Sequence, residues 1–189
     1  MDRAFIFGYG SLLRRAEQPG PPVELPCVLD GYRRGWDVAM DNTKDLAGYK
    51  FYVDRLTRER PAVFVTFLNI HRHDDARVNG VVFEVTRARL ARYDDRERNY
   101  ERREVGDRLS ARFPGPVWAY VGTPAARRRY ELAASGGRAV VGRGYYDKVL
   151  ADFASFGPDV LDEFRRTTLE PAVPARDLVR RPVVAALAP

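Results

Sequence analysis

The sequence predicts an α+β domain: a small mixed β-sheet, curved or barrel-like, with helices at its periphery. Three observations lead to this class. Strand-like segments fill most of the first two-thirds of the chain, a few helical segments come later, and no repeat or long linker divides the 189 residues. We place the domain at residues 1–170 and expect residues 171–189, which hold four prolines, to form an irregular tail.

The expected strands are justified by apolar runs and by turn signals between them. Residues 4–7 form a continuous apolar run, as in a strand buried on both faces. The prolines at 19–22 predict a loop, and the polar stretch 69–75 also reads as a loop. The dipeptide Asn79-Gly80 predicts a tight turn into the next strand. The remaining strands are expected at 27–40, 49–53, 62–70, 81–85, 108–113 and 117–121.

Helices are predicted from caps and from apolar spacing. Thr86 is a suitable N-cap for a short helix over 87–94, and Thr123-Pro124 opens a second helix that ends near residue 134. An apolar stripe at helical spacing predicts a helix over 145–156, and one more is expected at 159–168.

Composition excludes several classes of protein. No apolar run approaches the roughly 20 residues that cross a bilayer, and no signal peptide is visible, so we expect a cytoplasmic protein with no membrane partner. The net charge is +6, but the basic residues are scattered among almost as many carboxylates and no stacking-aromatic motif accompanies them. A nucleic-acid partner is therefore not expected.

Metal and thiol chemistry have little support. The stretch His71-x-His73-x-Asp75 opens a dinuclear zinc motif, but Ala76 stands where the motif needs a further histidine. These two histidines are the only ones in the chain, so we expect no metal site. The single cysteine, Cys27, follows a proline at a strand start and reads as a small buried hydrophobic residue.

A glycine-rich segment follows the first strand. Gly8-Tyr9-Gly10-Ser11 can present consecutive backbone N–H groups to one point, which favours an anion or a developing oxyanion. The segment does not match the dinucleotide fingerprint, because residue 13 is leucine, and Ser11 lacks the glycine two residues on that a nucleophile elbow needs. A plain strand-to-loop turn stays open as the alternative.

Carboxylates gather at residues 93–105. Clustering and burial can raise the pKa of one carboxyl group, which a general base needs. The alternative is a solvated, salt-bridged helix end followed by a loop.

Together, the strand end Phe-Gly-Tyr-Gly-Ser-Leu at 7–12 and the element Asp-x-Arg-Glu-x-x-Tyr-x-Arg at 94–102 resemble the γ-glutamylcyclotransferase-like family, whose ChaC-type members carry a Tyr-Gly-Ser-Leu loop. The resemblance covers most of the chain and extends to residues 31–34, 79–83 and 145–150. It implies the γ-glutamylcyclotransferase-like fold.

The resemblance also implies roles for individual residues. It assigns the catalytic carboxylate to Glu97 and substrate binding to Tyr9, Gly10, Ser11, Leu12, Tyr100 and Tyr146. Leu12 departs from the asparagine that many members have at this position.

The implied reaction needs no cofactor. The α-amine of a γ-glutamyl amide attacks its own γ-carbonyl, which releases 5-oxoproline and an amine, with one carboxylate moving the proton. Glutathione, a γ-glutamyl amine or dipeptide, and a γ-glutamyl-protected metabolite are all candidate substrates. The alternative is a non-catalytic binding module of the same fold that recognises an acidic ligand or RNA.

Overall fold

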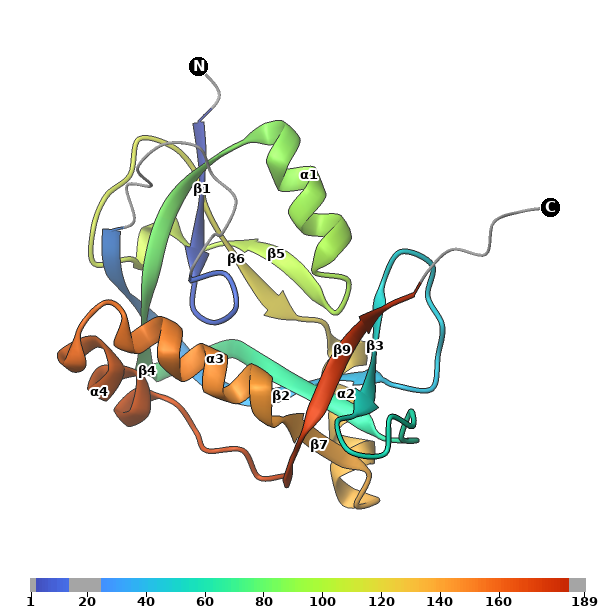
Figure 1. Cartoon of the computed structure of the whole chain (residues 1–189). Helices are drawn as coiled ribbons and strands as arrows, with labels where there is room; N and C mark the ends of the chain where they lie inside the picture. The colour runs from blue at the N-terminus through green and yellow to red at the C-terminus, as the bar shows by residue number, and fades with distance from the viewer. Residues whose placement is uncertain (1–2, 14–24, 184–189) are drawn as a thin grey trace.

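The computed structural model of this chain describes residues 3–13 and 25–183, and in them a mixed sheet is surrounded by four α-helices (Figure 1). The expected α+β class is confirmed. The proline loop expected at 19–22 and residues 184–189 of the expected tail lie outside the described residues.

Seven of the described strands form one sheet, and two more form a separate ribbon. The order in the sheet is β5-β6-β1-β4-β7-β8, and β2 pairs with the other edge of β4. The bounds in the sheet are β1 Arg3–Gly8, β2 Leu25–Asp41, β4 Phe64–Thr86, β5 Tyr100–Glu104, β6 Val117–Gly122, β7 Ala139–Gly142 and β8 Ala175–Arg176. The antiparallel ribbon is formed by β3 (Lys50–Asp54) and β9 (Leu178–Pro182).

The long strand β4 organises the sheet. Its first residues pair in parallel with β7, its last residues pair antiparallel with β1, and β2 runs antiparallel along its other edge. β2 bends at two register shifts, and the first of them contains Gly31, whose φ of 75° lies in the left-handed region that favours glycine. β4 thereby connects β1, which leads into the glycine loop, to β7, which leads into the third helix.

The four described helices are α1 (Arg87–Arg96), α2 (Pro124–Ser135), α3 (Arg143–Ala154) and α4 (Pro158–Thr167). The predicted caps are confirmed, because the hydroxyls of Thr86 and Thr123 accept backbone N–H groups in the first turns of α1 and α2. Helices α3 and α4 pack on each other through Phe153 and Phe164, whose ring centroids are 4.2 Å apart. None of the helices in the described ranges is long and apolar enough to cross a membrane.

The turn predicted at Asn79-Gly80 is wrong, because β4 continues through this dipeptide and through the polar stretch 69–75. Asn79 is buried; its side chain accepts a hydrogen bond from Arg34 and donates one to a carbonyl of α4. Gly80 passes close to β1, where a Cβ would lie 2.4 Å from the carbonyl oxygen of Gly8. Both residues are therefore required by contacts inside the sheet.

Several other expectations are corrected. Residues 108–113 form no strand: a 3-10 turn at Gly106–Arg108 precedes a single bridge between Leu109 and Leu29. The expected irregular tail contains β8 and β9, and the sequence did not predict β5 or β7. These short strands are held by partners that are distant in the sequence, so local periodicity gives little sign of them.

Arg34, on β2, is fully buried and connects three parts of the chain. All five N–H groups of its guanidinium have oxygen acceptors. Two are the hydroxyls of Thr167 and Thr168 at the end of α4, at 3.1 and 2.7 Å. The others are the carbonyl of Tyr9, at 3.3 Å, and the carbonyl and side-chain oxygens of Asn79, each at 2.7 Å.

Within residues 3–13 and 25–183, no carboxylate accepts a hydrogen bond from this guanidinium, and its acceptors are all neutral. Burial lowers the pKa of Arg34 to about 9, which leaves it charged at neutral pH. The rings of Phe164 and Phe153 lie 4.3 and 5.0 Å from the guanidinium carbon. Because a buried charge is costly unless its hydrogen bonds are satisfied, the glycine loop, β4 and α4 must keep their positions together.

We expect Arg34→Lys to lower the free energy of unfolding by about 3 kcal/mol, because one ammonium group cannot reach the acceptors that the planar guanidinium serves. Urea unfolding measures the change. Arg33→Lys, one residue earlier on β2 and partly exposed, is the matched control and should change stability by less than about 0.5 kcal/mol. A loss for Arg34→Lys no larger than that of the control would contradict this role of Arg34.

Candidate functional site

The glycine loop (residues 8–13) follows β1 and is shaped by a close backbone contact. A Cβ on Gly8 would lie 2.6 Å from the carbonyl oxygen of Leu12, so the chain path needs glycine there. The amide of Leu13 donates to the carbonyl of Gly10 at 2.9 Å and closes the turn. The conformation of the loop is therefore set by its own backbone.

The glycine loop offers free hydrogen-bond donors. Among the described residues, the backbone N–H groups of Gly10, Ser11 and Leu12 donate to no acceptor, and all three residues line a cavity. The Tyr9 hydroxyl, by contrast, donates to the backbone carbonyl of Tyr120 on β6 and holds the loop against the sheet. Consecutive donors of this kind favour an anion or a polarised carbonyl oxygen.

Glu97 is positioned by the end of α1. Its amide donates to the carbonyl of Tyr93 at 2.8 Å, and its φ and ψ of −92° and 44° turn the chain away from the helix. The amide of Tyr100 then donates to the carbonyl of Glu97 at 2.8 Å, and β5 begins. The spacing of three residues between Glu97 and Tyr100 is thus that of a tight turn between α1 and β5.

Asn99 fixes this turn to its surroundings. Its side-chain amide donates to the hydroxyl of Tyr49 at 3.2 Å, and its side-chain oxygen accepts from Arg129 at 3.1 Å. Its carbonyl accepts from the amide of Thr123 at 3.0 Å. Contacts from the residue before β3, from α2 and from the α2 cap therefore limit the movement of the turn.

Strand order brings the glycine loop and the turn together. β1 runs parallel to β6, and β6 runs antiparallel to β5. The C-terminal ends of β1 and β6 therefore lie at the same edge of the sheet as the N-terminal end of β5, where Tyr100 pairs with Gly122 (Figure 1). The glycine loop begins at this edge of the sheet, and the turn between α1 and β5 ends there.

Two adjoining cavities meet at Glu97. The inner cavity is small, and the outer cavity has a volume of about 500 Å³ and extends toward the β3–β9 ribbon and the start of α3. Ser11, Glu97, Tyr100 and Tyr145 line both of them. The complete lining of the inner cavity is Tyr9, Gly10, Ser11, Leu12, Leu68, Glu97, Tyr100, Tyr120 and Tyr145. The structure therefore brings together every sequence-predicted site residue except Tyr146.

Burial determines the acidity of Glu97. It raises the pKa of the carboxyl group above its usual range. The charges of Arg96, Lys50 and Arg180 oppose this shift, and Arg96 is the nearest, with its Nε 3.2 Å from a carboxylate oxygen of Glu97. Glu97 therefore takes up a proton more readily than an exposed glutamate does, as a group that accepts and returns a proton must.

Tyrosines surround this carboxyl group. Burial raises the pKa values of Tyr9, Tyr100 and Tyr145, so their hydroxyls stay neutral at physiological pH. The Tyr100 hydroxyl donates to the carbonyl of Leu68 at 2.8 Å, which fixes its ring at the cavity wall. The inner cavity thus combines apolar rings, neutral hydroxyls and one carboxyl group.

The placement of Tyr146 corrects the sequence-based assignment. Tyr146 lines neither cavity; its ring packs on Trp36, with centroids 5.1 Å apart, and its hydroxyl donates to Glu170 at 3.2 Å. Tyr145, one residue earlier on α3, lines both cavities instead. Successive helix residues point about 100° apart, so a shift of one position moves the side chain to another face.

Lys50 and Arg180 are site residues that the sequence did not reveal. Both line the outer cavity, from the two strands of the β3–β9 ribbon. Lys50 is one of only three lysines in the chain, which was its single distinguishing feature. Arg180 lies in the stretch expected to be an irregular tail, so no local signal pointed to it.

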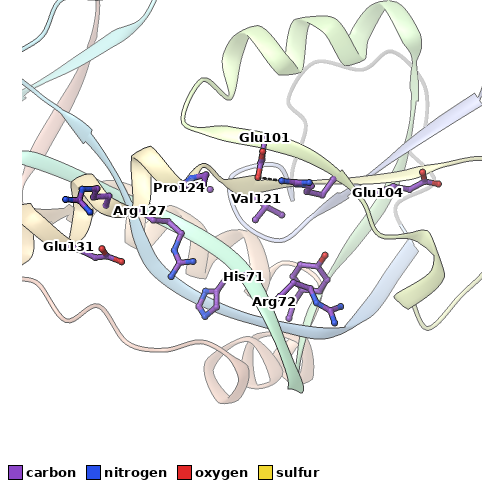
Figure 2. A pocket seen from close by; sticks show the side chains of 12 residues that line it. His71, Arg72, Glu101, Glu104, Val121, Pro124, Arg127 and Glu131 are labelled. Atoms are coloured by element: carbon purple, nitrogen blue, oxygen red, sulfur yellow. Dashed lines mark hydrogen bonds and ion pairs between the residues drawn. The ribbon is translucent and has the colours of Figure 1, made fainter.

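A further pocket is open and does not include Glu97 (Figure 2). Its wall carries both signs of charge, and two of the cations are paired: Arg103 with Glu101 at 2.6 Å, and Arg127 with Asp37 at 3.6 Å. No group of three or more potential metal-ligating side chains occurs in the part of the chain that the structure describes. This pocket offers no clear charge preference to a ligand.

The sequence of this chain matches a protein-family model. The model of the family described as "Gamma-glutamyl cyclotransferase, AIG2-like" matches residues 6–148. A search of curated proteins finds no match.

Solved structures show the same fold. YkqA from Bacillus subtilis superposes with a TM-score of 0.54 at 14% identity, over 88% of this chain and 54% of that one, so this chain spans about half its length. A γ-glutamyl cyclotransferase from yeast, described as specific to glutathione, gives a TM-score of 0.52 at 14% identity, over 89% of this chain and 98% of that one.

We expect Glu97→Gln to stabilise the protein at neutral pH and not in acid. The raised pKa means that the folded state binds a proton more tightly than the unfolded state, so wild-type stability falls as pH rises through the interval between the two pKa values. Glutamine does not titrate and escapes this loss. Urea unfolding at acidic and at neutral pH measures the difference.

The matched control is Glu104→Gln, at an exposed position on β5, which should show a much smaller pH-dependent change. A Glu97→Gln variant that is less stable than the wild type at neutral pH would contradict burial as the dominant influence on Glu97.

Proposed function

Because the chain belongs to the γ-glutamyl cyclotransferase, AIG2-like family, we propose that it cleaves a γ-glutamyl amide by cyclisation and releases 5-oxoproline and an amine. One observation carries the proposal: the buried carboxyl group of Glu97 and the free amides of the glycine loop line the same cavity. A proton carrier and a set of donors therefore face the same cavity.

The chemistry follows from a tethered nucleophile. The α-nitrogen of the substrate attacks the γ-carbon, a five-membered lactam forms, and the bond between the γ-carbon and the leaving nitrogen breaks. Because nucleophile and carbonyl belong to one molecule, orientation supplies on the order of 7 kcal/mol of the barrier. No serine or cysteine nucleophile is required, which agrees with the buried position of Cys27 on β2.

Glu97 moves the proton in this scheme. The α-ammonium group must lose a proton before it can attack, and the departing nitrogen must gain one. A single carboxylate performs both transfers if it lies beside both nitrogens. The position of Glu97, where the inner and outer cavities join, supports this role.

The glycine loop and Tyr100 hold the γ-glutamyl part. The N–H groups of Gly10, Ser11 and Leu12 face the α-carboxylate or the developing oxyanion, while Tyr9 and Tyr100 form the walls. The loop resembles that of ChaC-type members, so glutathione belongs among the substrates to test, with γ-glutamyl amines and dipeptides. A cytoplasmic location and independence of cofactors stay predictions.

We expect the purified protein to form 5-oxoproline from at least one γ-glutamyl amide in such a panel, detected by mass spectrometry. Glu97→Gln should lower kcat/KM by about 10³-fold, because glutamine cannot carry the proton. Glu104→Gln, outside both cavities, serves as the control and should keep the wild-type rate.

Two outcomes count against the proposal. Near-wild-type lactam formation by Glu97→Gln would remove Glu97 from the mechanism. Ligand binding without any 5-oxoproline would favour the alternative of a non-catalytic binding module.

The pH dependence of kcat/KM provides a separate test. The rate should fall as pH is lowered through the raised pKa of Glu97, because the base must be deprotonated. Arg96→Gln removes the nearest cation, raises the pKa of Glu97 further and should move the acidic limb to higher pH. Arg92→Gln, exposed one turn earlier on α1, should leave the limb in place. An acidic limb unmoved by Arg96→Gln would be inconsistent with Glu97 as the base.

A further inference from the structure

The outer cavity is the space available to the leaving amine. This step rests on the proposed function, in which the γ-glutamyl part lies against the glycine loop and Glu97. Because Ser11, Glu97 and Tyr145 line both cavities, a substrate cleaved at Glu97 extends directly from one into the other. The wall of the outer cavity therefore selects the leaving group.

Basic side chains dominate that wall. They outnumber the acidic ones, which are Asp95 and Glu97. The basic residues are Lys50, Arg55, Arg96, Lys148 and Arg180.

Three of these cations already have carboxylate partners. Arg55 pairs with Asp177 at 2.9 Å, Arg96 pairs with Glu97 at 3.2 Å, and Lys148 pairs with Asp152. Within the described ranges, Lys50 and Arg180 form no ion pair with any carboxylate. The unpaired positive charge of the outer cavity is therefore concentrated in these two side chains.

The β3–β9 ribbon brings the two unpaired cations to one side. Tyr52 lies opposite Arg180 in the antiparallel register, and Lys50 lies two residues before Tyr52 on the same face of β3. Arg181, the next residue on β9, points to the opposite face and does not line the cavity. Lys50 and Arg180 thus form a pair on the cavity side of the ribbon.

Lys50 is held in place by aromatic rings. Its ammonium nitrogen lies 4.5 Å from the ring centroid of Phe67 and 5.4 Å from that of Tyr49. Burial lowers the pKa of Lys50 to about 8, so it is mostly charged at neutral pH. The carboxylate of Glu97 acts on Lys50 only from beyond ion-pair distance. A partly desolvated ammonium group of this kind attracts an anion from the cavity more strongly than an exposed lysine does.

We propose that the substrate of this protein carries a carboxylate on its leaving amine, and that Lys50 and Arg180 bind this carboxylate. The substrate class is then a γ-glutamyl amide of an amino acid or peptide, in preference to a γ-glutamyl amide of a neutral or cationic amine. The β3–β9 ribbon acts as the specificity element on the leaving-group side.

A matched pair of substrates tests the proposal. γ-Glutamylglycine and γ-glutamylglycinamide have nearly the same size and differ in the carboxylate, and both release 5-oxoproline on cyclisation. We expect kcat/KM for γ-glutamylglycine to exceed that for γ-glutamylglycinamide on the order of 100-fold, because two charge-assisted hydrogen bonds are formed only with the carboxylate.

Variants identify the residues responsible. Lys50→Met and Arg180→Gln should each lower the ratio of kcat/KM for γ-glutamylglycine to kcat/KM for γ-glutamylglycinamide about tenfold. Either substitution also removes a charge that lowers the pKa of Glu97, but this affects both substrates alike and cancels in the ratio. Arg181→Gln, on the opposite face of the ribbon, is the matched control and should preserve the ratio between the two substrates. Thermal unfolding of each variant verifies that it is folded.

The outcomes separate this inference from the function on which it rests. Turnover of both substrates at equal kcat/KM, or variants that lower both rates equally, overturns the carboxylate site and leaves the cyclisation standing. Absence of 5-oxoproline from these two substrates and from the wider panel overturns both proposals.

Discussion

A buried guanidinium, that of Arg34, constrains the packing of this molecule, and none of its hydrogen-bond acceptors in the described part of the chain is a carboxylate. Arg34 is anchored by neutral oxygens from the glycine loop, from β4 and from the end of α4. Moving any of these segments leaves a charged donor unsatisfied in the core, which costs more than the loss of an apolar contact. The position of the glycine loop, which lines the inner cavity, therefore depends on the hydrogen bond from the Arg34 guanidinium to the carbonyl of Tyr9.

Burial has a different consequence for Glu97, the candidate catalytic residue. Arg34 has a full set of hydrogen bonds, whereas Glu97 is held in a partly apolar cavity with a single close cation. Its carboxyl group is consequently less stable as an anion than it would be in water, and the rest of the fold tolerates that cost. Rigid support by Asn99 and by the edge of the sheet keeps the group from relaxing into solvent.

Short sequence patterns correctly predicted the structural features that depend on residues nearby in the chain. The caps at Thr86 and Thr123 and the turn closed by Leu13 in the glycine loop each depend on neighbours within a few residues. The turn predicted at Asn79-Gly80 does not form, because Asn79 instead accepts hydrogen bonds from Arg34, 45 residues away in the sequence. The resemblance predicted a helix at these residues but not how that helix is rotated about its axis. Tyr146 was therefore expected at the cavity that Tyr145 lines. β9 and Arg180 were missed because a five-residue strand has no signature without its partner.

The β3–β9 ribbon joins two strands that are distant in the sequence. The segments around the inner cavity, from the glycine loop to Tyr145, fall within residues 6–148, the range that matches the family, whereas β9 lies beyond it. In the proposed scheme the leaving-group site therefore combines Lys50, inside the matched range, with Arg180, outside it. Substitution of Arg180 in this short C-terminal strand would then redirect the protein toward a different class of compound without replacing Glu97 or the glycine loop.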